Sequence, residues 1–210
     1  MTEAKVRQQY NRLADVYDQR WNAYITKTLD FFETWVNLSH AEKVLDVACG
    51  TGEFERIVLA KKPEQQIAGV DISEQMLAIA QRKLQPFPNV SFTVANASNL
   101  PFADQSFDVV VSANAFHYFD HPDIALREMR RVLKPSGRVI ILDWCRDFLS
   151  CRVCDIFLKL IDPAHRQCYT QEEFHYLLAT AGFEIESTEK ARFSWIWGLM
   201  IATGRPSTII

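Results

Sequence analysis

Hydrophobic residues near the N-terminus recur at intervals of three or four, which is the spacing of an amphipathic helix. They predict two helices, over residues 6–17 and 23–38. From residue 43 onward, short apolar runs alternate with segments of helical spacing, an alternation typical of an α/β fold with parallel strands and helices on both faces. The expected strands cover residues 43–47, 67–70, 90–95, 107–112 and 138–142, and the expected helices cover 53–61, 74–84 and 124–133.

The alternation stops after Asp143. A helical run over residues 148–161 follows, and then a helix over 169–181, for which Thr170 is the expected N-cap and Gly182 the expected stop. Two further apolar stretches, residues 183–188 and 194–202, predict strands that close the sheet.

We expect one domain over residues 1–210, because this length suits a single hydrophobic core. Residues 42–143 form its expected core, and 170–204 contribute the last helix and the closing strands. Residues 1–38 and 147–169 are not needed to build the sheet. They are therefore the natural covers of a pocket, the first as a helical cover and the second as a lid.

Composition narrows the class of protein. The chain is 48% hydrophobic and 23% charged, with a net charge of −3, which is ordinary for a globular protein. It has no run of lysine or arginine, so we do not expect nucleic acid as a partner. The polar residues 1–11 lack the apolar region of a secretory signal, and no long apolar stretch predicts a transmembrane segment. The expected location is the cytoplasm.

The five cysteines leave two interpretations open. Cys151 and Cys154, with His165 and Cys168 nearby, have the count of a zinc site. The alternative is that they are small buried apolar residues of a helix. We favour the second interpretation, so the expected metal is none and the thiols are expected to be free.

The segment Val44-Leu45-Asp46-Val47-Ala48-Cys49-Gly50-Thr51-Gly52 carries the strongest chemical signal. An apolar strand ends in an acid and a turn of small residues, and a helix follows. Gly50 and Gly52 lack a Cβ atom, so the backbone can turn sharply and approach a ligand. Asp71 ends the next strand, at the place where α/β nucleotide-binding folds put a carboxylate on a ribose. Together these features predict that this half of the α/β fold binds a nucleoside.

The turn differs from the two common phosphate-binding loops. It lacks the third glycine of the dinucleotide fingerprint, and it lacks the Gly-Lys-Ser/Thr ending of a P-loop. An acid ahead of the turn would repel a pyrophosphate, whereas it would attract an ammonium group. A nicotinamide-dependent dehydrogenase is therefore disfavoured.

With these motifs, the chain resembles the class I S-adenosylmethionine-dependent methyltransferases, and within them the type 11 branch typical of ubiquinone and menaquinone biosynthesis. The resemblance is strong over residues 44–142. It implies a Rossmann-like, mostly parallel seven-stranded sheet whose last strand is antiparallel and inserts between its neighbours. It also implies S-adenosyl-L-methionine as cofactor and S-adenosyl-L-homocysteine as product. A non-catalytic protein of the same fold that binds either nucleoside remains the alternative.

Ligands of an open α/β sheet bind beyond the carboxyl ends of the strands, and this rule selects the candidate cofactor residues. Asp46 and the turn would bind the methionine amine and carboxylate, and Asp71 the ribose hydroxyls. Ile72 and Met76 would pack on adenine. The resemblance puts Asn96 where the family usually has an acid for the adenine amino group, and Ala97 beside it. The cofactor-binding candidates are Tyr17, Asp46, Ala48, Gly50, Gly52, Asp71, Ile72, Met76, Asn96, Ala97 and Ala113.

Methyl transfer needs alignment above all, and a base only where the acceptor must lose a proton. His117 follows the fourth expected strand and is the candidate base. Tyr17 belongs to a segment that resembles the cofactor-covering helix of the family. Aromatic residues concentrate in the expected lid and last strand, which favours a small hydrophobic or aromatic acceptor. They are Trp21, Trp144, Phe148, Phe157, Tyr169, Trp195 and Trp197.

Overall fold

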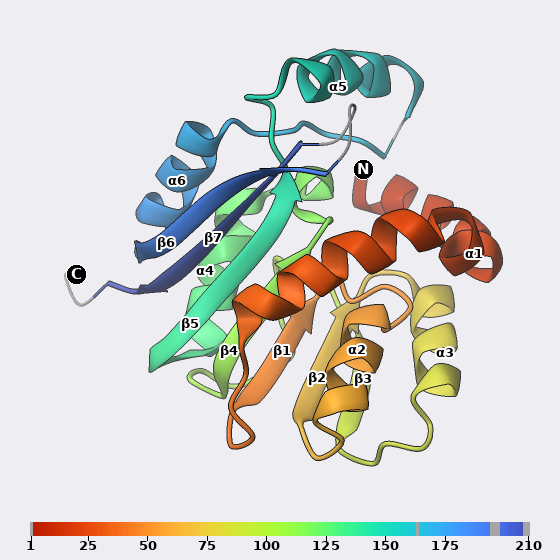
Figure 1. Cartoon of the computed structure of the whole chain (residues 1–210), viewed down its shortest axis with the longest axis vertical. Helices are drawn as coiled ribbons and strands as arrows, with labels where there is room; N and C mark the ends of the chain where they lie inside the picture. Colours follow the sequence, from red (N-terminus) through yellow and green to blue (C-terminus); the bar gives the residue numbers. More distant parts are fainter. Residues whose placement is uncertain (1, 163, 194–197, 208–210) are drawn as a thin grey trace.

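The computed structural model describes residues 2–162, 164–193 and 198–207. Its centre is a seven-stranded sheet in the order β3-β2-β1-β4-β5-β7-β6 (Figure 1). Strands β1 to β5 pair in parallel, and β7 lies antiparallel between β5 and β6. The expected sheet and the expected place of its last strand are therefore confirmed. The strands are β1 Lys43–Val47, β2 Gln66–Asp71, β3 Val90–Val94, β4 Phe107–Ala113, β5 Leu133–Trp144, β6 Phe183–Arg192 and β7 Gly198–Pro206.

Helices cover both faces of the sheet. The helix α1 runs across one face, over α2 and α3, while α4 and α6 pack on the other face (Figure 1). Thr170 caps α6 through a full capping box, as its position predicted. The helices are α1 Thr2–Val36, α2 Glu53–Lys61, α3 Glu74–Lys83, α4 Pro122–Val132, α5 Leu149–Ile161 and α6 Gln171–Thr180, with a short 3₁₀ turn η1 at Phe116–Tyr118.

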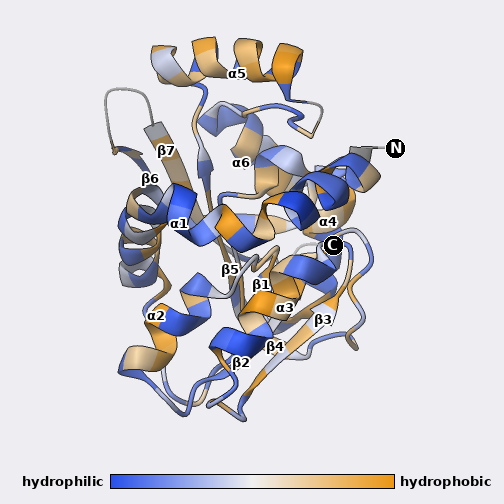
Figure 2. Ribbon diagram, turned by 90° about the vertical axis from the view of Figure 1, so that its right-hand side faces the viewer, coloured by the Kyte–Doolittle hydropathy of each residue, from blue (hydrophilic) through white to orange (hydrophobic). Residues whose placement is uncertain are grey.

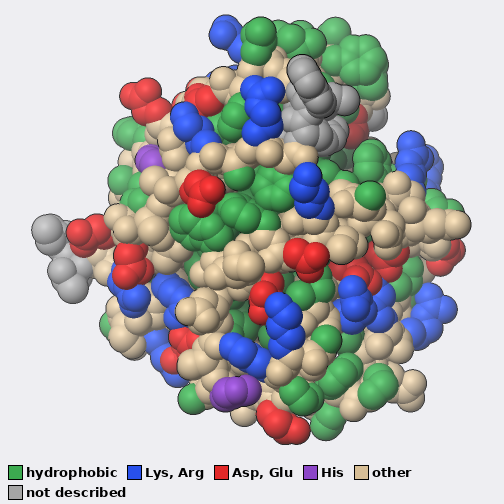
Figure 3. All heavy atoms as spheres, in the orientation of Figure 1, with side chains coloured by type: hydrophobic (Ala, Val, Ile, Leu, Met, Phe, Trp, Pro, Cys, Tyr) green, Lys and Arg blue, Asp and Glu red, His purple; other side chains and the backbone are tan. Residues whose placement is uncertain are grey.

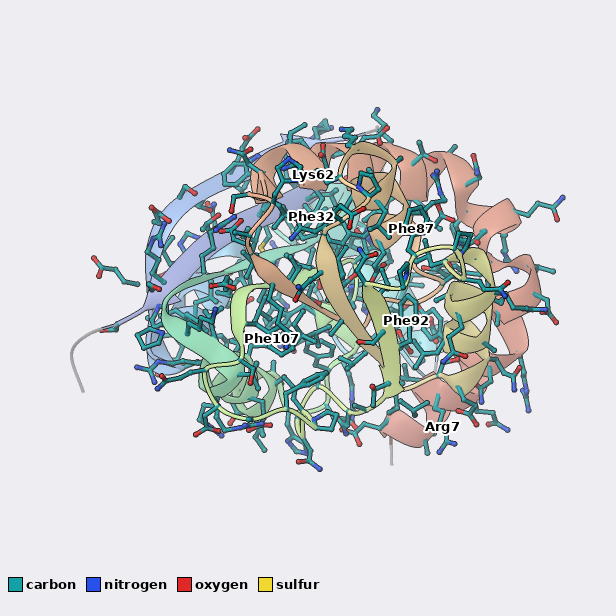
Figure 4. The ribbon with its side chains drawn as sticks, turned by 90° about the horizontal axis from the view of Figure 1, so that it is seen from below. Arg7, Phe32, Lys62, Phe87, Phe92 and Phe107 are labelled. Atoms are coloured by element: carbon teal, nitrogen blue, oxygen red, sulfur yellow. The ribbon has the colours of Figure 1, made fainter. Side chains whose placement is uncertain are left out.

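Two separate hydrophobic cores follow from this layering. Phe32 of α1 belongs to the core under α1 and α2, and Phe107 of β4 belongs to the core under α4 and α6. Figure 4 shows the two phenylalanines on opposite faces of the sheet. Because both faces are covered, the central strands are buried almost along their whole length.

The largest differences from the sequence prediction concern α1, β5 and β6, which extends to Arg192. The N-terminal segment is a single helix, α1, because residues 18–22 include neither glycine nor proline to interrupt it. Strand β5 begins at Leu133, five residues before the expected start at residue 138. The pairing with β4 jumps from Leu133 to Arg138, so Pro135 lies in a bulge where the ladder needs no N–H group.

The expected strand 194–202 begins outside the described residues, as do Trp195 and Trp197; its described part starts at Gly198. Among the described helices, none is both long enough and apolar enough to cross a bilayer. The carboxyl ends of the parallel strands point toward α5 and toward the first half of α1 (Figure 1), so any ligand of these strand ends lies beneath α1.

Candidate active site

The turn after β1 has an unusual backbone. Ala48, Gly50 and Gly52 all have positive φ angles, of 65°, 57° and 77°. A Cβ atom on Gly50 would meet no atom within 4 Å, so this glycine borders open space. A Cβ atom on Gly52 would lie 3.1 Å from the side chains of Ala80 and Leu84. Gly50 therefore leaves room for a ligand, whereas Gly52 allows the turn to pack on α3.

The carboxylate of Asp71 holds this turn in place. Its Oδ2 accepts a hydrogen bond of 2.9 Å from the Gly50 N–H, and its Oδ1 accepts one of 2.8 Å from the Ser73 N–H. Burial raises the pKa of Asp71, while these backbone donors act in the opposite direction. Asp71 thus joins the end of β2 to the turn after β1 and still borders the cavity described next.

A cavity of about 840 Å³, its open mouth included, lies over the carboxyl ends of β1, β2 and β4. The charged residues among those that line it, Glu3, Asp71 and Asp120, are all acidic. Such a lining suits a cationic ligand and disfavours a phosphate. Nine of the candidate cofactor residues line the cavity: Tyr17, Ala48, Gly50, Asp71, Ile72, Met76, Asn96, Ala97 and Ala113.

Asp46, Gly52 and His117 do not line this cavity. Asp46 is buried beneath the turn, where it interacts with Glu55 of α2. Burial raises the pKa of Asp46, and the charges of Glu55 and Asp71 raise it further. Burial also raises the pKa of Glu55, to about 7. The pair therefore retains a proton near neutral pH, and the structure supports a role for Asp46 below the turn rather than at the cavity wall.

Three polar contacts attach α1 to the site, and sequence reasoning missed all of them. Ser73 Oγ donates to Asn11 Oδ1 at 2.6 Å, and Thr51 Oγ1 donates to Asp18 Oδ1. Lys83 Nζ of α3 donates to the other oxygen of Asp18 at 2.7 Å. The partners lie far apart in the sequence, so only the folded chain brings them together. Through these contacts α1 lies against the turn in this structure.

Tyrosine rings form the wall of the cavity beneath α1. The Tyr10 ring centre lies 5.9 Å from that of Tyr17 and 5.5 Å from that of Tyr118, both edge to face. Burial raises the pKa of Tyr17 to about 12, so its hydroxyl is protonated at neutral pH. Phe119 and Val6 border the same space. This part of the wall is apolar and aromatic.

His117 lies behind that wall and is 1% exposed. Its Nδ1 is 2.6 Å from Asp143 Oδ1, and its backbone N–H donates to Asp143 Oδ2 at 2.6 Å. The imidazole stacks on Trp144 with ring centres 4.2 Å apart, and Tyr118 contacts it from the cavity side. Within the part of the chain that the structure describes, Nε2 has no hydrogen-bond partner. A role of His117 as base stays a prediction.

The possible zinc residues are not gathered as the sequence spacing suggested. Among the described residues, the ligand atoms that converge within 4.8 Å belong to Asp155, His165 and Cys168. Asp155 Oδ1 already interacts with His165 Nε2 at 2.8 Å and accepts from the Cys168 N–H at 2.7 Å, and its Oδ2 accepts from Lys159 Nζ at 2.8 Å. Burial raises the pKa of Cys168, which favours its thiol. These contacts favour the expectation of a metal-free cluster.

The cavity fits S-adenosylmethionine in its chemistry. Open space beside Gly50, an acidic lining and the Asp71 carboxylate suit a nucleoside that carries a sulfonium and an ammonium group but no phosphate. Fold and site together therefore define a class I S-adenosylmethionine-dependent methyltransferase.

Comparisons with known proteins agree. Residues 45–141 match the family model described as a methyltransferase domain. A demethylmenaquinone methyltransferase of Staphylococcus epidermidis is 31% identical over 201 residues, 90% of this chain and 79% of that protein. One from Thermotoga maritima is 46% identical over 102 residues, but these cover 49% of this chain and only 43% of that protein. The chain thus belongs to the class I S-adenosylmethionine-dependent methyltransferase family, and its cofactor is S-adenosylmethionine.

Solved structures support the fold. An S-adenosylmethionine-dependent methyltransferase of Thermotoga maritima superposes with a TM-score of 0.75, at 22% identity, over 95% of this chain and 98% of that one. At this identity the likeness concerns the fold alone.

The first prediction concerns Asp71. We expect Asp71→Ala to weaken binding of S-adenosylhomocysteine by roughly 1.5–3 kcal/mol, because a charged acceptor is lost and the turn loses its anchor. Asp123→Ala, which removes an exposed partner of Arg127 on α4, is the matched control. Calorimetry on both folded variants measures the effect. Wild-type affinity of Asp71→Ala would remove Asp71 from the site.

The second prediction concerns the buried acid pair. The native state retains a proton on Glu55 up to a pKa of about 7, whereas the unfolded chain releases it near 4.5. The free energy of unfolding should therefore fall as the pH rises from about 4.5 to 7, by up to about 3 kcal/mol from this group. The variant Glu55→Gln should lack this part of the pH dependence of the free energy of unfolding.

Denaturant titrations between pH 5 and 8 test this expectation, with exposed Glu172→Gln as control. An unchanged slope in Glu55→Gln would show that Glu55 is not the group responsible.

The third prediction concerns the cysteine cluster. We expect the purified chain to contain no stoichiometric zinc and five thiols reactive after unfolding. Elemental analysis and thiol titration measure both quantities. One equivalent of zinc that is lost in Cys168→Ser would contradict the expectation.

Proposed function

We propose that this enzyme methylates a small, hydrophobic aromatic acceptor of the quinol type, as its relatives named demethylmenaquinone methyltransferases do. The aromatic wall of the cavity is the observation that supports this most. Tyr10, Tyr118 and Phe119 border the cavity, together with Val6. Flat apolar rings bind a flat apolar ring by burial and by edge-to-face contacts, and no basic side chain is present among the lining residues to favour an acidic acceptor.

The bound cofactor supplies an electrophilic methyl group: the acceptor's electron pair forms the new bond to the methyl carbon, the electrons of the broken C–S bond stay on sulfur, and the acceptor releases a proton. The chain provides position and shielding. Asp71 and the turn at Gly50 fix the nucleoside, and α1 excludes water above it through its contacts at Asn11 and Asp18.

A proton-accepting group is needed where the acceptor is a ring carbon. The Asp143–His117 pair is the candidate, since the carboxylate at Nδ1 leaves the lone pair on Nε2. His117 is separated from the cavity by Tyr118. We therefore propose that the Tyr118 side chain rotates aside, that Nε2 of His117 then accepts the proton directly from the acceptor, and that Asp143 stabilises the charged imidazole.

The proposed function is tested by incubating the chain with radiolabelled S-adenosylmethionine and a reduced, short-chain demethylnaphthoquinol. We expect label in an apolar product, with the methyl group on the ring carbon in its mass spectrum. Transfer to amines or carboxylates from a panel, but not to the quinol, would contradict the acceptor class. Tight cofactor binding without transfer to any member of the panel would support the non-catalytic alternative.

The fourth prediction separates chemistry from cofactor binding. His117→Ala should lower turnover by on the order of 10²–10⁴-fold, because a base acts on the acceptor and not on the sulfonium. Affinity for S-adenosylhomocysteine should stay within about threefold, since His117 does not line the cavity. Asp143→Asn should reproduce the loss, because the imidazole then lacks its charged partner at Nδ1. If the turnover of His117→Ala is within a few-fold of wild type, His117 is not the base, and the rate of transfer comes from alignment of the two substrates only.

A further inference from the structure

The helix α5 has its apolar side turned to solvent. Six large hydrophobic side chains on it are between 58% and 80% exposed, an unusual number for one short helix. Figure 2 shows α5 as a largely hydrophobic helix set apart from the sheet, and in Figure 3 hydrophobic side chains gather along the top of the molecule, where α5 lies. These residues are Leu149, Val153, Ile156, Phe157, Leu160 and Ile161.

Their spacing makes a continuous outer face. Leu149, Val153, Ile156 and Leu160 follow one another at intervals of four, three and four residues, so they form one stripe along the helix. Phe157 and Ile161 widen that stripe on one side. The sequence predicted Phe157 as part of a lid wall, but its ring is 58% exposed.

The opposite face of α5 contacts the rest of the protein through polar groups. Asp155 is 2% exposed and interacts with His165, Lys159 and the Cys168 N–H. Cys151 accepts a hydrogen bond of 3.1 Å from the Gly198 N–H at the start of β7. The usual arrangement, with the apolar side inward, is therefore reversed, and burial within the described chain does not explain the outer face.

Charge indicates what covers this face. The exposed charged side chains of α5 are Arg152 and Lys159, both cationic and both on the border of the stripe. Lys159 also pairs with the buried Asp155, so Arg152 is the cation of this border that has no acid on α5 as partner. The acid of the helix, Asp155, is turned inward. Just beyond the helix ends, Asp147 pairs with Lys190, and Asp162 accepts from the Ala164 N–H. An apolar stripe with a cationic border is typical of a helix that lies in the interface of an anionic membrane.

We propose that α5 is a docking helix that lays this outer face on a phospholipid bilayer with anionic headgroups. A second copy of the chain fits less well, because antiparallel pairing of two α5 helices would place their cationic borders on the same side. Docking would bring the strand ends beside α5 close to the surface in which an apolar acceptor dissolves (Figure 1). This consequence rests on the proposed function, whereas membrane binding itself does not.

The test is co-sedimentation of the full chain with vesicles of phosphatidylcholine, alone or with roughly a third phosphatidylglycerol. We expect binding that is strongest to the anionic vesicles. The double variant Ile156→Asp/Leu160→Asp should bind at least about tenfold more weakly, because two apolar side chains of the membrane-facing stripe are replaced by anions. Tyr176→Asp, at a 69% exposed position on α6, should bind like wild type.

Arg152→Gln should weaken binding about fivefold to anionic vesicles and little to neutral ones. Wild-type melting temperature and affinity for S-adenosylhomocysteine show that each variant is folded. If the double variant does not fold, Leu160→Gln alone, at the most exposed position of the stripe, replaces it and should weaken binding several-fold.

Absence of wild-type binding to either vesicle would overturn the proposal, as would equal binding by the variants. A lipid-independent dimer that the double variant dissociates would assign the face to a second copy instead. These outcomes are distinct from failure of the proposed function, because transfer to a water-soluble acceptor needs no membrane. If the proposal holds, the double variant keeps that activity and loses turnover of an acceptor dissolved in vesicles.

Discussion

The N–H groups of Gly50 and Ser73 converge on one carboxylate, that of Asp71, and the geometry of the site depends on this convergence. The two donors belong to the loops that follow β1 and β2, which are neighbours in the sheet. Without the acceptor between them, the turn would hold its positive φ angles with no charged group to satisfy Gly50. The same carboxylate borders the cavity, so the group that shapes the turn is also the group that a ribose would meet.

The helix α1 is hydrogen-bonded to the same two loops that Asp71 joins. Asn11 is linked to Asp71 through Ser73, and Asp18 is linked to the turn through Thr51. The cover is thus attached to the elements that bind the cofactor, and not to a remote surface. The helix α1 and the loops that follow β1 and β2 are thus joined by hydrogen bonds in this structure.

The segment 147–169, which was expected to be a lid, contributes none of the described residues that line the cavity, and its helix α5 has two contrasting faces. Its inner face is held by polar contacts around Asp155, while its outer face is apolar. An enzyme for a water-soluble acceptor gains nothing from such a face, which carries an aggregation risk. An enzyme for an acceptor dissolved in lipid gains access to it. The two proposals agree with each other, because an apolar wall at Tyr10 and Tyr118 and a membrane-facing α5 would both serve an acceptor dissolved in lipid.

The sequence predicted the structure well where neighbouring residues determine it. The apolar run before the glycine turn and the helix after it were predicted residue for residue, as β1 and α2 show. The prediction failed where contacts between residues far apart in the sequence determine the structure. Asp18 and Asn11 had no local signal, because their partners are 33 and 62 residues away.

The rule that ligands lie beyond strand ends does not say which way a side chain points. Asp46 accordingly lies under the turn beside Glu55, and His117 lies behind Tyr118. Nor does helical spacing say which face of a helix is inward, so the exposed stripe of α5 could not be told from a core.

A crystal structure of the chain with S-adenosylhomocysteine tests most directly whether Asp71 and the turn at Gly50 form the cofactor site. We expect the ribose hydroxyls on the Asp71 carboxylate, the adenine between Ile72 and the Asn96–Ala97 segment, and the amino-acid end beside Gly50 under α1. A nucleoside bound elsewhere, or one in this cavity whose ribose makes no contact with Asp71, would contradict that assignment.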